Sequence, residues 1–338
     1  MAGTRVTGAV ACFHRLRVAD VITETADAHS LVLPVPPALT AAFTYRPGQY
    51  LTVRMPDGTL ARCYSLSSSP HTDADLKITV KRVPGGRASN WICDHVRAGT
   101  TLEFTPPAGS FTPASLDDDL LLLAGGSGIT PVIAIIKSVL ARGSGRLAVV
   151  YANRDARSVI FAAELAALGE RHGGRLAVTH WLDSERGAPT GDALAPLLRA
   201  YAQREAFVCG PDPFVAVARQ ALHRAGVPAD RVRVESFDSD TTVPAAARDA
   251  TAEVTLDGQT HHLPWPAGAR LLDVIISAGL NPPFSCRQGN CGTCACRLLH
   301  GQVELVHNEV LEDEDFAEGY ILACQAIARS DTVAVTYE

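Results

Sequence analysis

Short stretches in which apolar and polar residues alternate dominate the first third of the chain. The segments YLTVRMPDG, ARCYSLSSS and LKITVKRV are rich in β-branched and aromatic residues, and proline and glycine separate them. Alternation with a period of two is typical of strands that bury one face, and the breaks between them are typical of turns. We therefore expect residues 1–113 to form a small antiparallel β-barrel.

Farther along the chain, strand-sized and helix-sized apolar segments follow one another. The run at 120–124 and the segments LAVVYANR and RLAVTHWL are strand-sized, and helical stretches at 132–140 and 159–168 separate them. Strands that alternate with helices are typical of a parallel sheet with crossover helices. We therefore expect residues 114–238 to form an α/β domain.

The C-terminal part of the chain has a third pattern. Residues 239–250 (SDTTVPAAARDA) are small and polar and contain a proline, which is typical of a linker. Downstream, AEVTLDGQTHHLPW predicts a hairpin through Asp257 and Gly258, and LLDVIISAG predicts a short helix that ends at Gly279. We expect residues 251–338 to form a separate α+β domain.

Composition and charge argue against a membrane-spanning protein, a secreted protein and a nucleic-acid-binding protein. No apolar run is long enough to span a membrane, and the N-terminus lacks the apolar segment of a signal peptide, so we expect a cytoplasmic protein. The net charge is −6, but residues 251–338 alone carry −8. An acidic module excludes nucleic-acid binding. It suits a basic protein partner, or it simply keeps the module in solution.

The nine cysteines are unevenly distributed. Cys286, Cys291 and Cys294 follow the spacing C-x4-C-x2-C, and 29 further residues separate them from Cys324. This spacing resembles that of plant-type ferredoxins and predicts a 2Fe–2S cluster held by four thiolates. A zinc site is the alternative, although zinc loops prefer C-x2-C pairs. We expect the neighbouring Cys296 to be a packed free thiol.

A motif in the predicted barrel indicates flavin binding. The string RCYSLS resembles the R-x-Y-S motif of the ferredoxin–NADP reductase superfamily. Arg62 and Tyr64 project from the same face of a strand, so Arg62 can hold a pyrophosphate while Tyr64 packs on the flavin. The resemblance implies that Ser65 places its hydroxyl near flavin N5, where hydride arrives, and that Leu66 completes the motif.

Two further segments support FAD. In GGRASN, Gly86 and Ser89 match the superfamily's G-x-x-S turn, in which backbone N–H groups at a helix start bind the pyrophosphate. PAGSF resembles its closing segment P-x-G-x-F. Each string alone also fits an ordinary turn or edge strand, but all three occur in the order that the superfamily shows.

A glycine-rich turn predicts the nicotinamide-nucleotide site. Gly125, Gly126 and Gly128 follow an apolar strand and precede a helix, which is an arrangement that binds a dinucleotide pyrophosphate. We expect Thr130 to cap that helix and Pro131 to occupy its first position. The string GGSGITP resembles the G-[TSG]-G-I-[TA]-P motif of the same reductase superfamily. It differs from G-x-G-x-x-G, the common fingerprint of Rossmann folds.

A second turn completes the predicted site. Cys209, Gly210 and Pro211 resemble the superfamily's C-G-P turn, which implies that the Cys209 thiol lies near the hydride-bearing carbon. A buried apolar thiol is the alternative for Cys209. Phe237 resembles the aromatic residue that shields the flavin, but it also fits the core. Ser65 and Cys209 are thus the candidate catalytic residues.

The preference between NADH and NADPH depends on the residues after the strand LAVVY. Arg154 or Arg157 can bind a 2′-phosphate, whereas Asp155 repels it. We expect NADH, with NADPH as the alternative.

Together these motifs predict an electron path from NADH through FAD and the cluster to a separate protein. Hydride carries two electrons and a 2Fe–2S cluster accepts one, so flavin must lie between them. The domain order resembles the reductase components of bacterial multicomponent oxygenases, with a C-terminal β-grasp-like ferredoxin domain. The chain itself shows no oxygen-activating motif such as E-x-x-H pairs.

The strings ARCYSLSSSP, AGGSGITP, YANRDARSVIF and CRQGNCGTCACRL resemble most the reductases of 3-ketosteroid 9α-hydroxylase. That family implies NADH and a Rieske-type oxygenase as partner. The reductase of phenylacetyl-CoA epoxidase is similar in the same motifs, so a di-iron epoxidase or another oxygenase stays an alternative acceptor. A redox-responsive binding protein without significant turnover is the alternative of another class.

Overall fold

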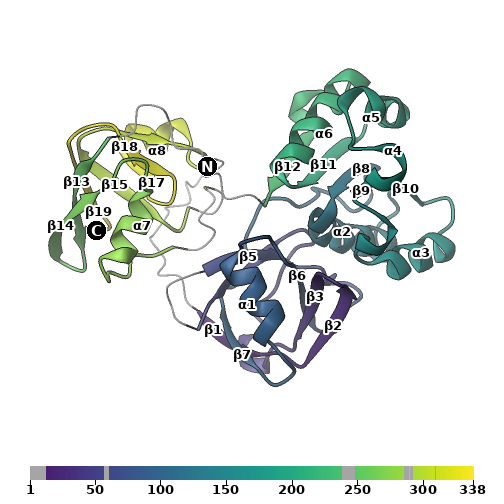
Figure 1. Ribbon diagram of the computed structural model, residues 1–338, viewed down its shortest axis with the longest axis horizontal. Helices are drawn as coiled ribbons and strands as arrows, with labels where there is room; N and C mark the ends of the chain where they lie inside the picture. The colour runs from purple at the N-terminus through teal and green to yellow at the C-terminus, as the bar shows by residue number, and fades with distance from the viewer. Residues whose placement is uncertain (1–12, 57–60, 238–247, 285–288, 290–291, 309) are drawn as a thin grey trace. The chain divides into compact units, whose positions relative to one another are not determined.

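The computed structural model describes residues 13–56, 61–237, 248–284, 289, 292–308 and 310–338 (Figure 1). These residues fall into two compact units. The larger unit contains residues 15–56 and 63–237, and the smaller one contains the described residues from 248 onward together with residues 13–14 and 61–62. The first two predicted domains thus share one unit, while most of the predicted linker lies outside the described residues.

The barrel region consists of two antiparallel sheets, as predicted. A bridge between Leu66 and Ile78 connects them, and helix α1 (Arg87–His95) follows the second sheet. The first sheet has the order β1-β7-β4-β5 and the second has the order β2-β3-β6. The strands are β1 (His14–Arg17), β2 (Asp20–Thr25), β3 (Ala28–Leu33), β4 (Tyr50–Arg54), β5 (Ala61–Ser65), β6 (Leu76–Lys81) and β7 (Thr101–Phe104).

The nucleotide region is built on one parallel sheet with the order β10-β9-β8-β11-β12. Helices cover it on both faces (Figure 1). The strands are β8 (Leu120–Gly125), β9 (Leu147–Asn153), β10 (Leu176–Leu182), β11 (Glu205–Gly210) and β12 (Val232–Ser236), and the helices are α2 (Ile129–Arg142), α3 (Ala162–Arg171), α4 (Asp183–Arg186), α5 (Gly191–Leu198) and α6 (Asp212–Ala225).

Continuous apolar strands explain why this sheet is covered on both sides. Successive side chains point to opposite faces, so Leu120 and Leu122 enter the core beneath α2 and α3, whereas Leu121 and Leu123 enter the core beneath α5 and α6. All four are fully buried. The carboxyl ends of the central strands therefore meet at one edge of a rigid sheet.

The helix expected over residues 159–168 begins later than predicted. Residues 156–158 form a 3-10 turn, and Asp155 caps it by accepting a hydrogen bond from the backbone N–H of Ser158. Phe161 then adopts a left-handed conformation with φ of 60°, and helix α3 starts only at Ala162. A local capping box therefore outweighs the helical periodicity here.

The C-terminal unit is an α+β fold, as predicted. Its five-stranded sheet has the order β14-β13-β19-β15-β17, and β16 pairs separately with β18. Asp257 and Gly258, at φ of 53° and 75°, form the predicted hairpin turn. The elements are β13 (Ala250–Leu256), β14 (Gln259–Trp265), α7 (Leu271–Ser277), β15 (Ala295–His300), β16 (Val303–Leu305), α8 (Asp313–Ala317), β17 (Tyr320–Leu322), β18 (Ala326–Ala328) and β19 (Thr332–Thr336).

Candidate functional site

Strand β5 carries the first predicted flavin residues. Arg62 is exposed, and its guanidinium donates to the carbonyl oxygen of Ala61 at 2.8 Å. Tyr64 is half-buried, whereas Ser65 and Leu66 are buried. The strand alternation thus places Arg62 and Tyr64 on one face of β5 and directs Ser65 to the buried face.

The predicted phosphate turn lies at the N-terminus of α1. Gly86 is the N-cap residue of this helix, and the Ser89 hydroxyl accepts a hydrogen bond from the backbone N–H of Val83 at 3.2 Å. A Cβ atom on Gly86 would lie 2.7 Å from the Ser89 oxygen, so glycine keeps this turn tight. The N–H groups of the first helical turn lack partners within the helix and can face an anion.

The glycine turn after β8 differs in one detail from the prediction. Gly125 ends the strand, Gly126 has φ of 52°, and α2 begins at Ile129. Thr130 is therefore inside the helix, and its hydroxyl donates to the carbonyl oxygen of Ser127 at 3.0 Å. The prediction that Thr130 caps the helix and that Pro131 is its first residue is wrong, because the chain enters α2 through a 3-10 turn.

The turn after β11 lies directly against the glycine turn. A Cβ atom on Gly128 would be 2.0 Å from the carbonyl oxygen of Cys209, so only glycine permits this approach. Gly210 follows, and its carbonyl oxygen accepts the backbone N–H of Phe237 at 3.4 Å. Pro211 is the N-cap residue of α6, and Phe237 packs partly buried against the core.

A buried carboxylate brings the two candidate catalytic residues together. The Ser65 hydroxyl donates to Glu235 Oε2 at 3.2 Å, and the Cys209 thiol donates to the same oxygen at 3.9 Å. All three side chains are buried. Burial raises the pKa of Cys209 well above its usual value, and the charge of Glu235 raises it further, so this thiol stays protonated.

Sequence reasoning missed the part that Glu235 takes in this cluster. The residue lies near the end of β12, and parallel pairing sets it opposite Cys209 on β11. The signal was present, since an acidic residue at the carboxyl end of a parallel strand lies where ligands bind in such sheets. Tyr151 was also missed: its buried hydroxyl donates to the carbonyl oxygen of Gly126 at 3.1 Å and so supports the glycine turn.

The residues that follow β9 are arranged around an ion pair. Arg154 Nη2 lies 2.9 Å from Oδ2 of Asp27, a residue of the barrel between β2 and β3. Asp155 is occupied in capping the next turn through Ser158. Arg157 is 94% exposed and lies 3.8 Å from Asp155.

The structure describes two of the four predicted cluster ligands. Cys294 and Cys324 are buried, and the backbone N–H of Cys324 donates to the Sγ atom of Cys294 at 3.5 Å. Cys286 and Cys291 lie outside the described residues. Cys296 is a buried free thiol, and burial raises its pKa to about 12.

Models of three protein families match consecutive parts of the chain. The oxidoreductase FAD-binding domain matches residues 15–112, and the oxidoreductase NAD-binding domain matches residues 122–220. The 2Fe-2S iron-sulfur cluster binding domain matches residues 254–329.

Several relatives align with the chain over almost its whole length. The 3-ketosteroid-9-alpha-monooxygenase ferredoxin reductase components of Rhodococcus rhodochrous and Mycolicibacterium smegmatis are 49% and 50% identical to this chain. The alignments cover 95% and 96% of this chain, and 96% of each relative. The chain belongs to the family of oxygenase reductase components.

More distant comparisons agree with this membership. The reductase is 34% identical to one component of the 1,2-phenylacetyl-CoA epoxidase of Escherichia coli, over 96% of this chain and 98% of the relative. Among solved structures it resembles phthalate dioxygenase reductase, with a TM-score of 0.66 and 25% identity over 96% of this chain and 98% of that one. The reductase is therefore an NAD(P)H-dependent oxidoreductase with FAD-, NAD- and 2Fe–2S-binding domains.

The residues present fit these three groups. The tight turn at Gly86 and the contact between Gly128 and Cys209 leave backbone N–H groups for two pyrophosphates, and neither turn tolerates a Cβ atom. In the C-terminal unit, the buried pair of Cys294 and Cys324 has the donor chemistry of an iron–sulfur site. Within the part of the chain that the structure describes, no helix is long and apolar enough to cross a membrane.

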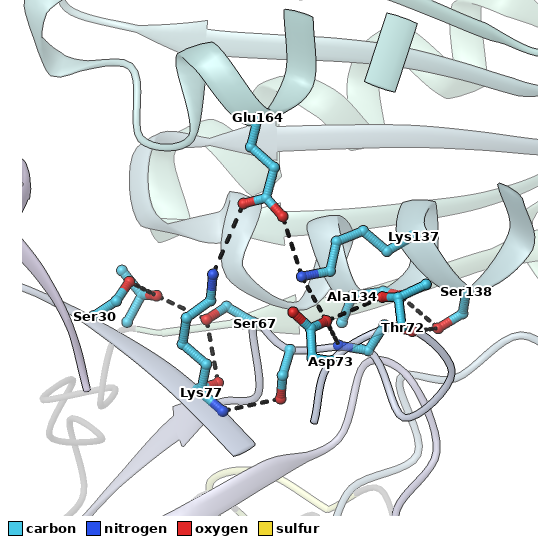
Figure 2. Close-up of polar contacts among 12 residues, drawn as sticks. Ser30, Ser67, Thr72, Asp73, Lys77, Ala134, Lys137, Ser138 and Glu164 are labelled. Carbon is cyan, nitrogen blue, oxygen red and sulfur yellow. Dashed lines mark hydrogen bonds and ion pairs between the residues drawn. The ribbon is translucent and has the colours of Figure 1, made fainter. Parts of the chain in front are cut away.

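A buried lysine of the reductase joins the barrel to the nucleotide region (Figure 2). Lys137 of α2 is 5% exposed, and its Nζ atom lies 2.7 Å from Asp73 Oδ2 and 3.1 Å from Glu164 Oε1. Lys77 of β6 approaches the other oxygen of Glu164 at 3.8 Å. These four residues form an ionic clasp in which both regions supply both signs of charge.

Two neutral contacts accompany the ionic clasp. The hydroxyls of Ser69 and Ser138 lie 2.8 Å apart and are buried. The rings of Phe111 and Phe207 meet edge to face, with their centroids 5.1 Å apart. Together with the clasp, these contacts join the same two regions that supply Ser65 and Glu235.

Proposed function

We propose that this reductase takes hydride from NADH and delivers single electrons to a Rieske-type oxygenase that hydroxylates a 3-ketosteroid at C9. The electron path through FAD- and 2Fe–2S-binding domains follows from the family. The acceptor is inferred from relatives at 49–50% identity over almost the whole chain, compared with 34% for the epoxidase component. This difference in sequence identity is the observation on which the choice of partner rests.

The buried cluster of Ser65, Glu235 and Cys209 supports a hydride-transfer site. FAD, when bound, supplies the chemistry that converts a two-electron donor into single electrons. Glu235 accepts from Ser65, so the direction of the serine hydroxyl is fixed, and the neutral thiol of Cys209 adds no charge beside the nicotinamide. Burial of the three side chains excludes water that would otherwise compete for the reacting atoms.

In this proposal the remaining candidate residues bind the flavin, the nicotinamide nucleotide and the cluster. Arg62 and the α1 turn at Gly86 and Ser89 hold the flavin pyrophosphate, while Tyr64 and Phe237 flank the flavin ring. The glycine turn, Gly210 and Pro211 hold the nicotinamide nucleotide. Four thiolates, from Cys286, Cys291, Cys294 and Cys324, hold the irons.

The ion pair between Arg154 and Asp27 supports a preference for NADH. In nucleotide-binding sheets, the 2′ group of the adenosine ribose lies beyond the end of the second strand, which is β9 here. A 2′-phosphate needs an uncommitted cation, but Arg154 already has a carboxylate at 2.9 Å, and Arg157 lies 3.8 Å from the carboxylate of Asp155. Asp155 adds a second negative charge in the same segment.

Reconstitution tests the proposed partner. The purified reductase is mixed in turn with a Rieske-type 3-ketosteroid oxygenase and with a di-iron phenylacetyl-CoA epoxidase, and NADH consumption is compared with product formed. We expect coupled turnover with the steroid oxygenase and its ketosteroid substrate. Coupled turnover with the epoxidase alone would overturn the choice of partner while leaving the electron path intact.

A simpler assay tests the reductase activity itself. The protein is expected to reduce an artificial acceptor such as cytochrome c with NADH, because both cofactors that the electron path requires have matching domains. Negligible reduction by a protein that holds both FAD and cluster would favour a redox-responsive binding protein. The six cysteines that the structure describes are free thiols, which suits the cytoplasmic location that we also propose.

A further inference from the structure

We propose that Gln325 raises the reduction potential of the cluster by donating its side-chain amide to the Cys324 thiolate, and that Arg270 positions this amide. The inference rests on the proposed function through Cys324, the candidate fourth ligand. The Gln325 Nε2 atom lies 3.7 Å from Cys324 Sγ, within hydrogen-bonding distance for sulfur. The Gln325 side chain is 5% exposed, so water does not replace this contact.

Arg270 determines which end of the amide faces sulfur. Its Nη1 atom donates to Gln325 Oε1 at 2.8 Å and to the backbone carbonyl of Gln325 at 3.3 Å. A guanidinium only donates, so its partner must be the amide oxygen. The amide N–H groups are consequently directed away from Arg270 and toward the sulfur. Arg270 precedes α7 and is its N-cap residue, so the helix fixes its backbone.

Gln325 also contacts the cysteine loop. A Cβ atom on Gly289, which has φ of 82°, would lie 3.1 Å from Gln325 Cγ and 2.7 Å from the carbonyl oxygen of His307. The backbone of Gly289 therefore lies against the stem of Gln325. One side chain thus lies between Gly289, the fourth candidate ligand in the turn that joins β17 to β18, and a cation.

The change in charge on reduction determines whether the amide raises or lowers the reduction potential. Reduction adds one electron to the cluster and no proton, so the negative charge on the four thiolates increases. A donor directed at a thiolate stabilises the reduced form more than the oxidised form, and a buried site strengthens this difference. The backbone N–H of Cys324, which donates to Cys294 Sγ, acts in the same direction.

Two substitutions at Gln325 test the proposal by dye-mediated redox titration of the holoprotein, with electron paramagnetic resonance of the reduced cluster. Q325L removes the donor, and Q325E keeps the shape and the bond to Arg270 but places a carboxylate beside the thiolate. We expect a more negative cluster potential in both variants, larger in Q325E, with altered resonance positions. R270M should shift the potential in the same direction.

The matched control is Q259L, at an exposed glutamine in β14 of the same unit, which should keep the wild-type potential. Wild-type potentials in Q325L and Q325E would overturn the proposal. Loss of the cluster from both variants would also overturn it, because Gln325 would then serve assembly. If C324S retained a normal cluster, the ligand assignment would fail instead, so the two failures are distinguishable.

Discussion

The two ends of the electron path are constructed differently. At the proposed hydride end, Ser65 comes from the barrel, whereas Cys209 and Glu235 come from the nucleotide region, and the three side chains meet where the two regions touch. At the proposed cluster end, Cys294, Cys324 and the surrounding donors all belong to one small unit. One site is shared between two regions and the other is contained in a single fold.

This difference follows from the chemistry at each end. Hydride transfer requires two ligands to be brought face to face, so a contact between two regions is the natural place for it. Single-electron transfer requires only a fixed cluster, and the C-terminal core around the fully buried Trp265 and Leu272 can hold one in place. We therefore expect damage at one end to leave the other end functional, and the hydride end to depend on its interface.

Cys324→Ser is expected to give the largest difference between its effects on the two ends. A hydroxyl is a poor ligand for iron, so cluster absorbance and cytochrome c reduction should be lost, while NADH still reduces the flavin at the wild-type rate in stopped-flow measurements. Cys296→Ser is the matched control, since this buried thiol is not a predicted ligand. A slowed flavin reduction in Cys324→Ser would show that the ends are not independent.

Glu235→Gln should impair the opposite end. Ser65 loses its charged acceptor, and the rate of flavin reduction by NADH is expected to fall by about 10²-fold. The cluster absorbance should not change. Glu205→Gln is the control, because Glu205 begins β11 at the far edge of the same sheet and pairs with Arg233. An unchanged reduction rate in Glu235→Gln would remove this carboxylate from the site.

The contrast between the ends also explains what the sequence could predict. The spacing of the cysteines is local, so it indicates the cluster without knowledge of the fold. The flavin and nucleotide turns are local as well. Glu235 matters only because parallel pairing sets it opposite Cys209 and because the barrel brings Ser65 to it. A contact across 170 residues leaves no periodic signal in the chain.

The same reasoning applies to errors at element boundaries. Periodicity predicted a helix from residue 159, but the chain turns at Phe161 because Asp155 and Ser158 cap each other. The start of α2 also differs from the prediction, because Ser127 and Gly128 belong to a 3-10 turn that precedes the helix. Side-chain capping and backbone turns decide such boundaries, and hydrophobic patterns do not record them.

Lys137→Met should weaken the hydride end through its interface. It removes the cation that lies between the carboxylates of Asp73 and Glu164, and we expect a loss of about 1–3 kcal/mol in the free energy of unfolding of the larger unit. Flavin release in urea measures this. Arg224→Met removes a more exposed ion pair to Asp192 and should cost less. Equal losses would mean that the ionic clasp has no special role.

Asp27→Asn tests whether the barrel also influences the nucleotide. Freeing Arg154 from its carboxylate should raise kcat/KM for NADPH by about threefold to tenfold, the gain typical of one charge-assisted contact, and change that for NADH less. Asp192→Asn, which frees Arg224 instead, is the control. If NADPH efficiency stays at the wild-type level, Asp27 does not determine the preference.

The smallest effect concerns pH and the ionic clasp. Burial by itself raises the pKa of Asp73, but hydrogen bonds from Lys137 and from the backbone of Ser69 outweigh it, so the pKa is lowered in the folded state. A carboxyl that is more acidic when folded stabilises the fold above its unfolded pKa, and this contribution is lost as pH falls through the folded value. The urea midpoint for flavin release should therefore fall more steeply below about pH 4 in the wild type than in Asp73→Asn. Parallel curves would show that the carboxylate of Asp73 adds no stability, and the interface would then depend on the pair of Lys77 and Glu164 and on its neutral contacts.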